Sequence, residues 1–222
     1  MELEYHEMAS GLRFPEGPIA LSDGSVLLLE IERQTLSRVL VDGTIQVVAT
    51  LEGGPNGAAV GPDGAIYICN NGGFNWIERN SRLLPGTQPE HFGGGSIQRV
   101  EMSSGKVDTI YRDCSGNILR GPNDIVFAKD GSFWFTDLGK MRDRDKDYGG
   151  LYFANIDGNH IEEKIFPIPG GGNGVGLSPD GKSIYVAETA SGRLFGWELQ
   201  QDGSLPAGLT AGFRNIVYTP DE

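Results

Sequence analysis

The sequence predicts an all-β protein, a β-propeller of which about four blades are present. Thirty-four glycines and 12 prolines are spread along the 222 residues, as expected for many short strands joined by tight turns. The chain also repeats one short pattern four times, at the spacing of propeller blades. A hydrophobic fraction of 38% is enough for a packed core. The whole chain, 1–222, is therefore predicted to be a single propeller domain.

Each copy of the repeat is a ten-residue segment that ends in Asp-Gly and continues into a short apolar strand. The segments are 15–24, 55–64, 122–131 and 172–181, and the strands that follow are 25–29, 65–69, 132–136 and 183–187. Asp-Gly between two apolar runs is a strong hairpin signal. Third and fourth strands are expected at 97–102 and 107–111, and at 150–154 and 161–166. Four antiparallel strands in each unit make a propeller blade.

Two parts of the chain depart from the repeat. Residues 71–95 lack strand alternation and are predicted to form a long insertion loop, either a surface excursion or a lid over the site. A last strand is expected at 215–219, and the chain stops at Glu222. A propeller must close on itself to pair its edge strands, so we expect that the C-terminal blades are absent from this chain. The blade edge that is left unpaired would be open to self-association. A closed four-bladed ring is the alternative.

Composition excludes several partners. The net charge of −12 disfavours binding to nucleic acid and to anionic membranes. The two cysteines, Cys69 and Cys114, have no zinc-site spacing. The N-terminus resembles no signal peptide, and no apolar run reaches membrane-spanning length. A cytoplasmic location is the resulting expectation.

Oxygen-bearing side chains recur at the second position of the repeat, where the copies have Glu16, Asn56, Asn123 and Asn173. The first strand of each blade lines the channel of a propeller, so these side chains should converge on the axis. Carboxylate and amide oxygens are ligands that calcium prefers. Asn56, within Pro-Asn-Gly, is equally well explained as a turn residue, whereas Glu16 lies in an apolar stretch where an unpartnered carboxylate is costly.

A second polar set lies at the ends of the next strands, with Glu30, Asn70, Asp137 and Glu188. These residues either cap the blade or face the channel. A structural role is favoured for Glu30, and Asp137, in Thr-Asp-Leu-Gly, is a candidate base.

Three of the segments resemble the family of senescence marker protein, gluconolactonase and luciferin-regenerating enzyme. They are Pro15–Pro18, Gly121–Asp124 and Asn173–Gly181. The patterns are also similar to those of paraoxonase and diisopropyl fluorophosphatase, and the resemblance runs from about residue 10 to the end. It implies a six-bladed propeller with one divalent cation on its axis, calcium first, with zinc or magnesium as alternatives. The implied ligands are Glu16, Asn123 and Asn173, and the family's last aspartate ligand has no counterpart.

The resemblance implies hydrolysis of a sugar-acid or related lactone, in which the cation polarises the ring carbonyl for attack by water. In place of the absent aspartate, Asp137 or Glu188 would assist the water. Asn56, Asn70 and Asn123 would contact the substrate. A polar channel mouth suits sugar lactones, whereas arylesters would favour a more apolar one.

Two other functions are compatible with the blades. One is a non-catalytic propeller that serves as an interaction scaffold. The other is an enzyme similar to strictosidine synthase, which needs no metal. The repeated Glu and Asn positions argue against both.

Overall fold

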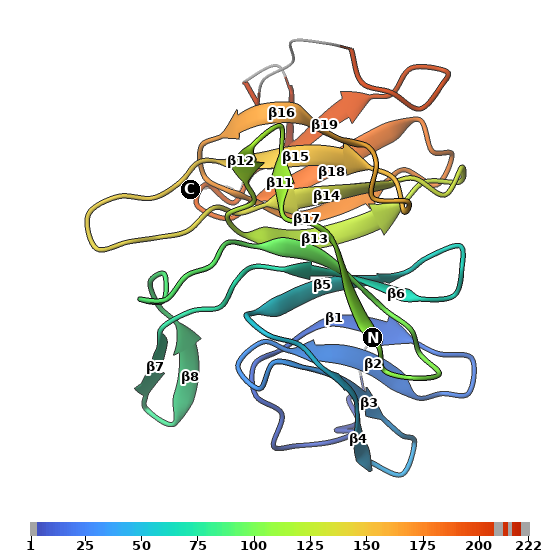
Figure 1. Ribbon diagram of the computed structural model, residues 1–222, viewed down its shortest axis with the longest axis vertical. Helices are drawn as coiled ribbons and strands as arrows, with labels where there is room; N and C mark the ends of the chain where they lie inside the picture. The colour runs from blue at the N-terminus through green and yellow to red at the C-terminus, as the bar shows by residue number, and fades with distance from the viewer. Residues whose placement is uncertain (1–3, 207–210, 213–214, 219–222) are drawn as a thin grey trace.

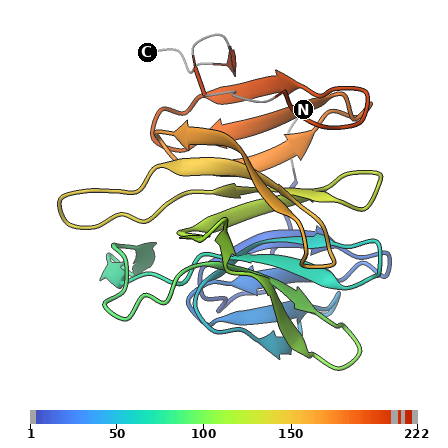
Figure 2. The same cartoon turned by 45° about the horizontal axis from the view of Figure 1, so that its top comes forward.

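The computed structural model describes residues 4–206, 211–212 and 215–218, and within these residues the fold is built from strands without an α-helix. Four antiparallel sheets of four strands follow one another along the molecule, from the N-terminal sheet at one end to the C-terminal sheet at the other (Figure 1). Turning the molecule shows the same stack of four blades (Figure 2). The predicted propeller architecture is confirmed.

The four blades share one strand order, with the first strand innermost. The first blade contains β1 (Pro15–Ala20), β2 (Val26–Glu30), β3 (Thr35–Val39) and β4 (Ile45–Thr50). The second contains β5 (Pro55–Val60), β6 (Ile66–Asn70), β9 (Ser96–Val100) and β10 (Val107–Tyr111). The third contains β13 (Pro122–Phe127), β14 (Phe133–Asp137), β15 (Gly149–Ala154) and β16 (Ile161–Ile168). The fourth contains β17 (Gly172–Leu177), β18 (Ser183–Glu188), β19 (Leu194–Glu198) and β20 (Ile216–Tyr218).

The strand bounds differ from the prediction by a residue or two in most places. Polar residues predicted to follow the second strands, such as Glu30 and Asp137, are the last residues of those strands and pair with the first strand of the same blade. The predicted final strand is β20, and Thr219 at its end lies outside the described residues.

The repeated Asp-Gly turns explain why each hairpin forms where it does. In the first blade, Gly24 has φ of 82°, a left-handed conformation that favours glycine. The Asp23 carboxylate accepts a hydrogen bond of 3.0 Å from the N–H of Ser25. Asp63, Asp130 and Asp180 accept the same i to i+2 bond. Asp-Gly therefore determines each turn locally, before any contact between blades.

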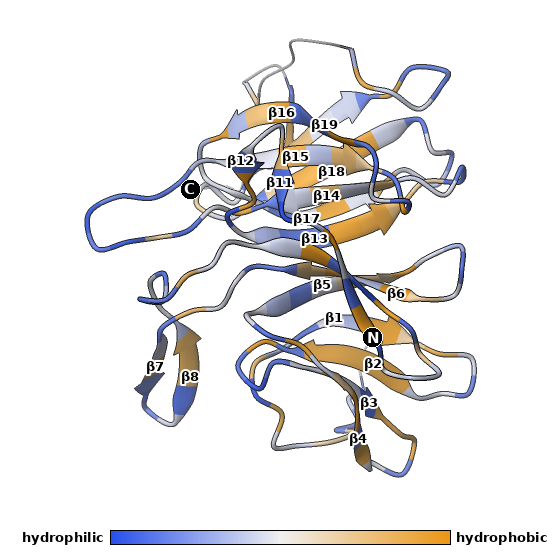
Figure 3. Ribbon diagram, viewed as in Figure 1, coloured by the Kyte–Doolittle hydropathy of each residue, from blue (hydrophilic) through white to orange (hydrophobic). Residues whose placement is uncertain are grey.

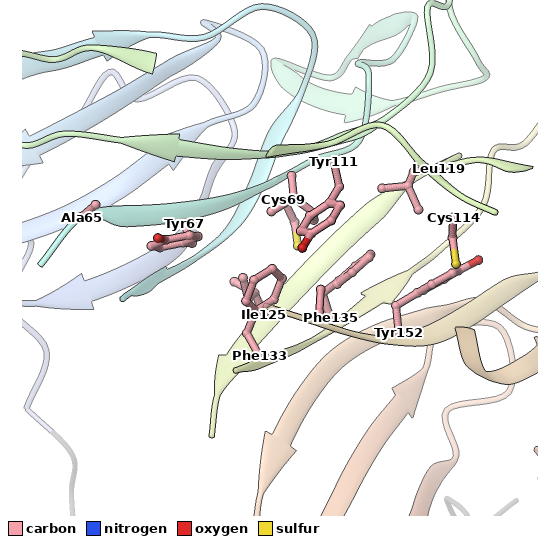
Figure 4. Close-up of a cluster of buried hydrophobic side chains, with 12 residues drawn as sticks. Ala65, Tyr67, Cys69, Tyr111, Cys114, Leu119, Ile125, Phe133, Phe135 and Tyr152 are labelled. Atoms are coloured by element: carbon pink, nitrogen blue, oxygen red, sulfur yellow. The ribbon is translucent and has the colours of Figure 1, made fainter. Parts of the chain in front are cut away.

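Apolar clusters fill the space between neighbouring blades. Leu29 and Ile68 belong to the cluster between the first and second blades. Tyr67 and Phe135 belong to the next, where aromatic rings from β6, β14 and β15 lie together (Figure 4). Trp134 and Val186 belong to the third cluster. Hydropathy colouring places apolar residues along the blade strands and polar ones in many connections (Figure 3), so burial of these faces stabilises the stack.

Two small hairpins stand outside the blades. β11 (Asp113–Cys114) pairs with β12 (Asn117–Ile118) after the second blade. Within 71–95, where the sequence predicted only a loop, β7 (Trp76–Arg79) pairs with β8 (Arg82–Pro85). The sequence signal was weak because this hairpin turns through Asn80 and Ser81, both at positive φ without a glycine. The hairpin and the β14–β15 connection project from the same side of the molecule (Figures 1 and 2).

Candidate functional site

The first strands of the four blades lie side by side, as the repeat predicted. β1 contacts β5, β5 contacts β13, and β13 contacts β17. Glycine at the third repeat position allows this approach, because a Cβ at Gly17 would lie 2.6 Å from the carbonyl oxygen of Asn56. A Cβ at Gly57 would lie 2.4 Å from the carbonyl oxygen of Asn123. The second repeat positions, Glu16, Asn56, Asn123 and Asn173, are therefore brought to one region. Together with Asp124, the neighbour of Asn123, we call them the axial cluster.

Asp124 is the member of the axial cluster that sequence reasoning missed. Its Oδ2 accepts a hydrogen bond of 3.0 Å from the N–H of Val175, and its Oδ1 accepts one of 2.9 Å from the N–H of Ile125. A Cβ at Gly57 would lie 2.9 Å from the same Oδ1. The carboxylate therefore lies between β5 and β17. The sequence did contain a signal for this residue. At the third position of the repeat the other three copies have glycine, and this copy has Asp124.

The charge of Asp124 disfavours the ionised form of Glu16, the other carboxyl group of the axial cluster. Solvent reaches Glu16, yet partial desolvation raises the pKa of its carboxyl, and the nearby Asp124 carboxylate raises it further. Burial raises the pKa of Asp124, against the opposing effect of hydrogen bonds from the N–H groups of Val175 and Ile125. Two carboxylates held together in this way form a site that a cation stabilises.

The three asparagines of the axial cluster differ in burial. Asn56 and Asn123 are buried, and Asn173 is partly buried. The Nδ2 of Asn173 donates a hydrogen bond of 2.8 Å to Oγ1 of Thr189. This bond orients the amide and leaves its Oδ1 as the oxygen that can act as a ligand.

The second polar set holds the entry to each blade. The last residue of each second strand accepts a hydrogen bond from an N–H group just before the first strand of the same blade. The four pairs are Arg13 to Glu30 at 2.8 Å, Gly54 to Asn70 at 2.8 Å, Gly121 to Asp137 at 2.7 Å and Gly170 to Glu188 at 2.6 Å. The structural role favoured for Glu30 thus extends to all four positions.

Asp137, the predicted base, is almost completely buried. Besides Gly121, the N–H groups of Arg120 and Gly139 donate to its carboxylate at 2.8 and 2.7 Å. Burial raises its pKa, while these three bonds act in the opposite direction. Glu188 also accepts a hydrogen bond from the hydroxyl of Ser191. These contacts favour structural roles, and catalysis by either residue stays a prediction.

Asn70, predicted to contact substrate, has its amide engaged within the protein. Its Nδ2 donates to the carbonyl oxygen of Glu52 and, at 2.9 Å, to Oε1 of Gln98. Its Oδ1 accepts from the N–H groups of Gly54 and Gly72. The bonds account for both amide hydrogens and favour a role in holding the second blade rather than in binding substrate.

The insertion is fixed to the third blade through a buried lysine. Nζ of Lys140 donates to the carbonyl oxygen of Gly73 at 2.7 Å and to Oδ1 of Asn71 at 3.1 Å, and lies 4.0 Å from the ring centroid of Phe74. Burial lowers the pKa of Lys140 to about 7, despite the opposing charges of Asp137 and Asp147. The start of the insertion is thus held against the third blade, while its β7–β8 hairpin is mostly exposed.

Side chains of the usual metal-binding types, His, Cys, Asp and Glu, do not form a complete metal site by themselves in the described part of the chain. Among the residues that the structure describes, no three His, Cys, Asp or Glu side chains are grouped so as to hold a metal ion. A cation at the axial cluster would need amide oxygens in addition to Glu16 and Asp124. In the same described part of the chain, no helix has the length and apolar character needed to cross a membrane.

Comparison with known proteins supplies a family for this chain. Residues 14–221 match the model of the SMP-30/Gluconolactonase/LRE-like region. A gluconolactonase from Zymomonas mobilis is 24% identical over 91% of this chain and 57% of its own length. The chain spans about half the length of the curated relatives that it matches.

Solved structures agree on the fold. A gluconolactonase from Xanthomonas campestris superposes with a TM-score of 0.66 at 22% identity, covering 87% of this chain and 60% of the other. Regucalcin from Agrobacterium tumefaciens, described as a calcium-binding protein, superposes with a TM-score of 0.64 at 19% identity, covering 90% of this chain and 59% of the other.

Proposed function

Because the chain belongs to the SMP-30/gluconolactonase/LRE-like family, we propose that its axial cluster serves a divalent-metal-dependent lactonase. The substrate would be the lactone of a sugar acid or a related lactone. The observation that carries the proposal is the pair of carboxyl groups on the first strands, Glu16 on β1 and Asp124 on β13, which interact electrostatically and share the axial cluster with asparagine amides. The name of the gluconolactonase relative supports the reaction class.

The axial cluster fits a hard cation. Each carboxylate has a raised pKa, and Asp124 raises that of Glu16, so a positive charge would relieve both. Calcium takes six to eight oxygen ligands and accepts amide oxygens among them. Glu16, Asn123 and Asn173 would hold the ion, with Asp124 as a further oxygen donor. Calcium is the first choice, as the name of the regucalcin neighbour suggests, with zinc or magnesium as alternatives.

A divalent cation bound there would polarise a lactone carbonyl and stabilise the oxyanion that forms when water attacks. The chain's own residues would orient the substrate. Asn56 and Asn123 offer amide groups to ring hydroxyls or the ring oxygen. Thr189 keeps the Asn173 amide in one orientation through the bond to its Nδ2.

A carboxylate must also take a proton from the attacking water. Asp124 is our first choice, since it lies in the axial cluster, and in this role it would face the attacking water in place of serving as a further oxygen donor to the ion. Asp137 and Glu188 are second choices, because they are buried at the entries of the third and fourth blades, outside the axial cluster.

Metal binding by Glu16→Gln tests this proposal before any substrate is chosen. We expect one calcium per chain in the parent protein, measured by titration calorimetry, and at least about tenfold weaker binding in the variant, since charge count tunes a calcium site. Glu198→Gln, at an exposed position on β19, is the matched control and should bind as the parent does. Hydrolysis of glucono-δ-lactone that is lost in chelator and restored by calcium would support the enzyme. Full activity in chelator, or no metal at millimolar calcium, would contradict it and favour a scaffold or a metal-independent enzyme.

A further inference from the structure

A small pocket lies directly beside the axial cluster. Its volume is about 310 Å³, and Phe74, Pro85, Leu138, Met141, Thr189 and Ala190 are among the residues that line it. Thr189 connects the two, because its Oγ1 accepts the hydrogen bond from Nδ2 of Asn173. A molecule with one group bound in the pocket would therefore reach the axial cluster with its other end.

The walls of this pocket have a different chemistry from the axial cluster. Phe74 and Pro85 come from the insertion, Leu138 and Met141 from the β14–β15 connection, and Ala190 from the turn after β18. These five side chains are apolar and Met141 is 61% exposed, whereas Lys140, Lys146, Asp147 and Thr189 supply the polar part of the lining. A polyhydroxylated substituent would lose hydrogen bonds to water against such walls, whereas an alkyl group would gain from burial.

The pocket is preformed because the insertion is attached to the third blade at two places. Near its start, Nζ of Lys140 bonds to the carbonyl oxygen of Gly73. Near its end, the N–H of Gln88 donates a hydrogen bond of 2.8 Å to the carbonyl oxygen of Met141. The ring of Trp76 packs edge-on against that of Phe74, with 5.8 Å between the ring centroids. The apolar wall is thus held in place without a bound molecule.

We propose that this pocket selects lactones that carry an apolar substituent, with the lactone ring at the axial cluster and an alkyl chain against Phe74, Leu138 and Ala190. The proposal rests on the proposed lactonase function and names the substrate class for it. A volume of about 310 Å³ is at the small end of ligand pockets, so a chain of a few carbons suits it better than a long acyl chain.

Binding in the presence of chelator tests the pocket without turnover. The probes are γ-nonalactone, a five-membered lactone with a pentyl chain, and γ-butyrolactone, the same ring without it. Tryptophan fluorescence provides the signal, because Trp76 contacts Phe74, and Trp76→Phe identifies its contribution. We expect the Kd of γ-nonalactone to be at least about tenfold lower, since even one methylene in an apolar pocket is worth about tenfold or more.

Ala190→Phe is the informative variant, because Ala190 is exposed at the pocket and a larger side chain fills the space without disturbing the core. It should reduce the preference for γ-nonalactone at least about fivefold. Ala20→Phe is the matched control, at an exposed position at the far end of β1, and should preserve the preference. Equal binding of the two lactones, or an unchanged preference in Ala190→Phe, would overturn the proposal.

Hydrolysis of both lactones and of glucono-δ-lactone with calcium separates this inference from the function on which it rests. Selective binding without hydrolysis of any lactone would support the pocket and contradict the lactonase. Hydrolysis of glucono-δ-lactone without selective binding of γ-nonalactone would overturn the pocket and support the lactonase.

Discussion

Lys140, on the third blade, donates a hydrogen bond of 2.7 Å from Nζ to the carbonyl oxygen of Gly73, at the start of the insertion of the second blade. The lysine is 2% exposed, and a charge buried to that extent persists only with compensating partners. Those partners are Gly73, Asn71 and the ring of Phe74. Together with the hydrogen bond from Gln88 to Met141, this contact positions the insertion relative to the axial cluster.

Lys140→Met should loosen the insertion. Methionine has a similar length but cannot donate to Gly73 or Asn71, and buried acceptors without a donor cost about 1–3 kcal/mol each. We expect faster hydrogen exchange of the amides in 71–95, with little change in the fourth blade. Lys146→Met, at an exposed position in the same connection, is the control and should exchange as the parent does. Unchanged exchange in Lys140→Met would show that the insertion is held by other contacts.

The stability of the protein should depend on the ionisation of Lys140. Its pKa is about 7 in the folded state and 10.5 as the ordinary value, so between these pH values the unfolded chain binds one more proton. The free energy of unfolding should therefore rise from pH 7 toward 10.5 through this residue, and that gain is lost as the pH falls to about 7.

Denaturant unfolding at several pH values measures this effect, and the difference between parent and Lys140→Met isolates it from other groups that titrate in the same range. A difference that does not change with pH would mean that Lys140 has the same pKa in both states.

Asp137→Asn should destabilise the entry to the third blade. Three N–H groups donate to the carboxylate, and an amide in its place puts an NH₂ group against at least one of them. We expect a loss of about 1–3 kcal/mol in the free energy of unfolding, measured with urea. Asp143→Asn, at an exposed position, should change it by less than about 0.5 kcal/mol. If Asp137→Asn left stability intact but removed lactone hydrolysis, the residue would be the base that the sequence predicted.

Gly17→Ala should separate the first two blades at the axial cluster. Gly17 has φ of 54°, and a Cβ there would approach the carbonyl oxygen of Asn56 to 2.6 Å. The neighbouring β5 backbone would have to move, which would displace Asn56 and Glu16 from each other. We expect weaker calcium binding and a loss of stability of about 1–3 kcal/mol.

Gly181→Ala is a control for the conformational part of the Gly17→Ala effect, since Gly181 has φ of 73° and open space around it. The Gly181→Ala variant should be less stable than the parent protein but should bind calcium with the same affinity. Equal metal affinity in Gly17→Ala and the parent would place Glu16 and Asn56 outside a common site.

Asp124→Asn should lower the pKa of Glu16. Asp124 is a like charge that raises this pKa, and asparagine keeps an oxygen for the N–H of Val175 while removing the charge. Carbon-detected NMR of the Glu16 carboxyl in chelator measures the titration. An unchanged Glu16 pKa would mean that the two carboxylates are too far apart to share a cation.

The sequence by itself determined the blades. Each Asp-Gly turn is local, since Asp23 bonds to Ser25 within the same hairpin, and the apolar runs around it form strands whatever lies beside them. The repeat also placed Glu16, Asn123 and Asn173 on the first strands of the first, third and fourth blades, because equivalent positions in the blades face the same axis. These predictions depended only on periodicity and turn chemistry.

Tertiary structure decided what each polar side chain contacts. Asp137 and Glu30 have the same position in the repeat as Asn70, and only the fold shows that their oxygens are used by the N–H groups that precede the first strands. Asp124 and Val175 are 51 residues apart, and Lys140 and Gly73 are 67 apart. Contacts between residues so distant arise from the packing of one blade on the next, and local propensity contains no information about them.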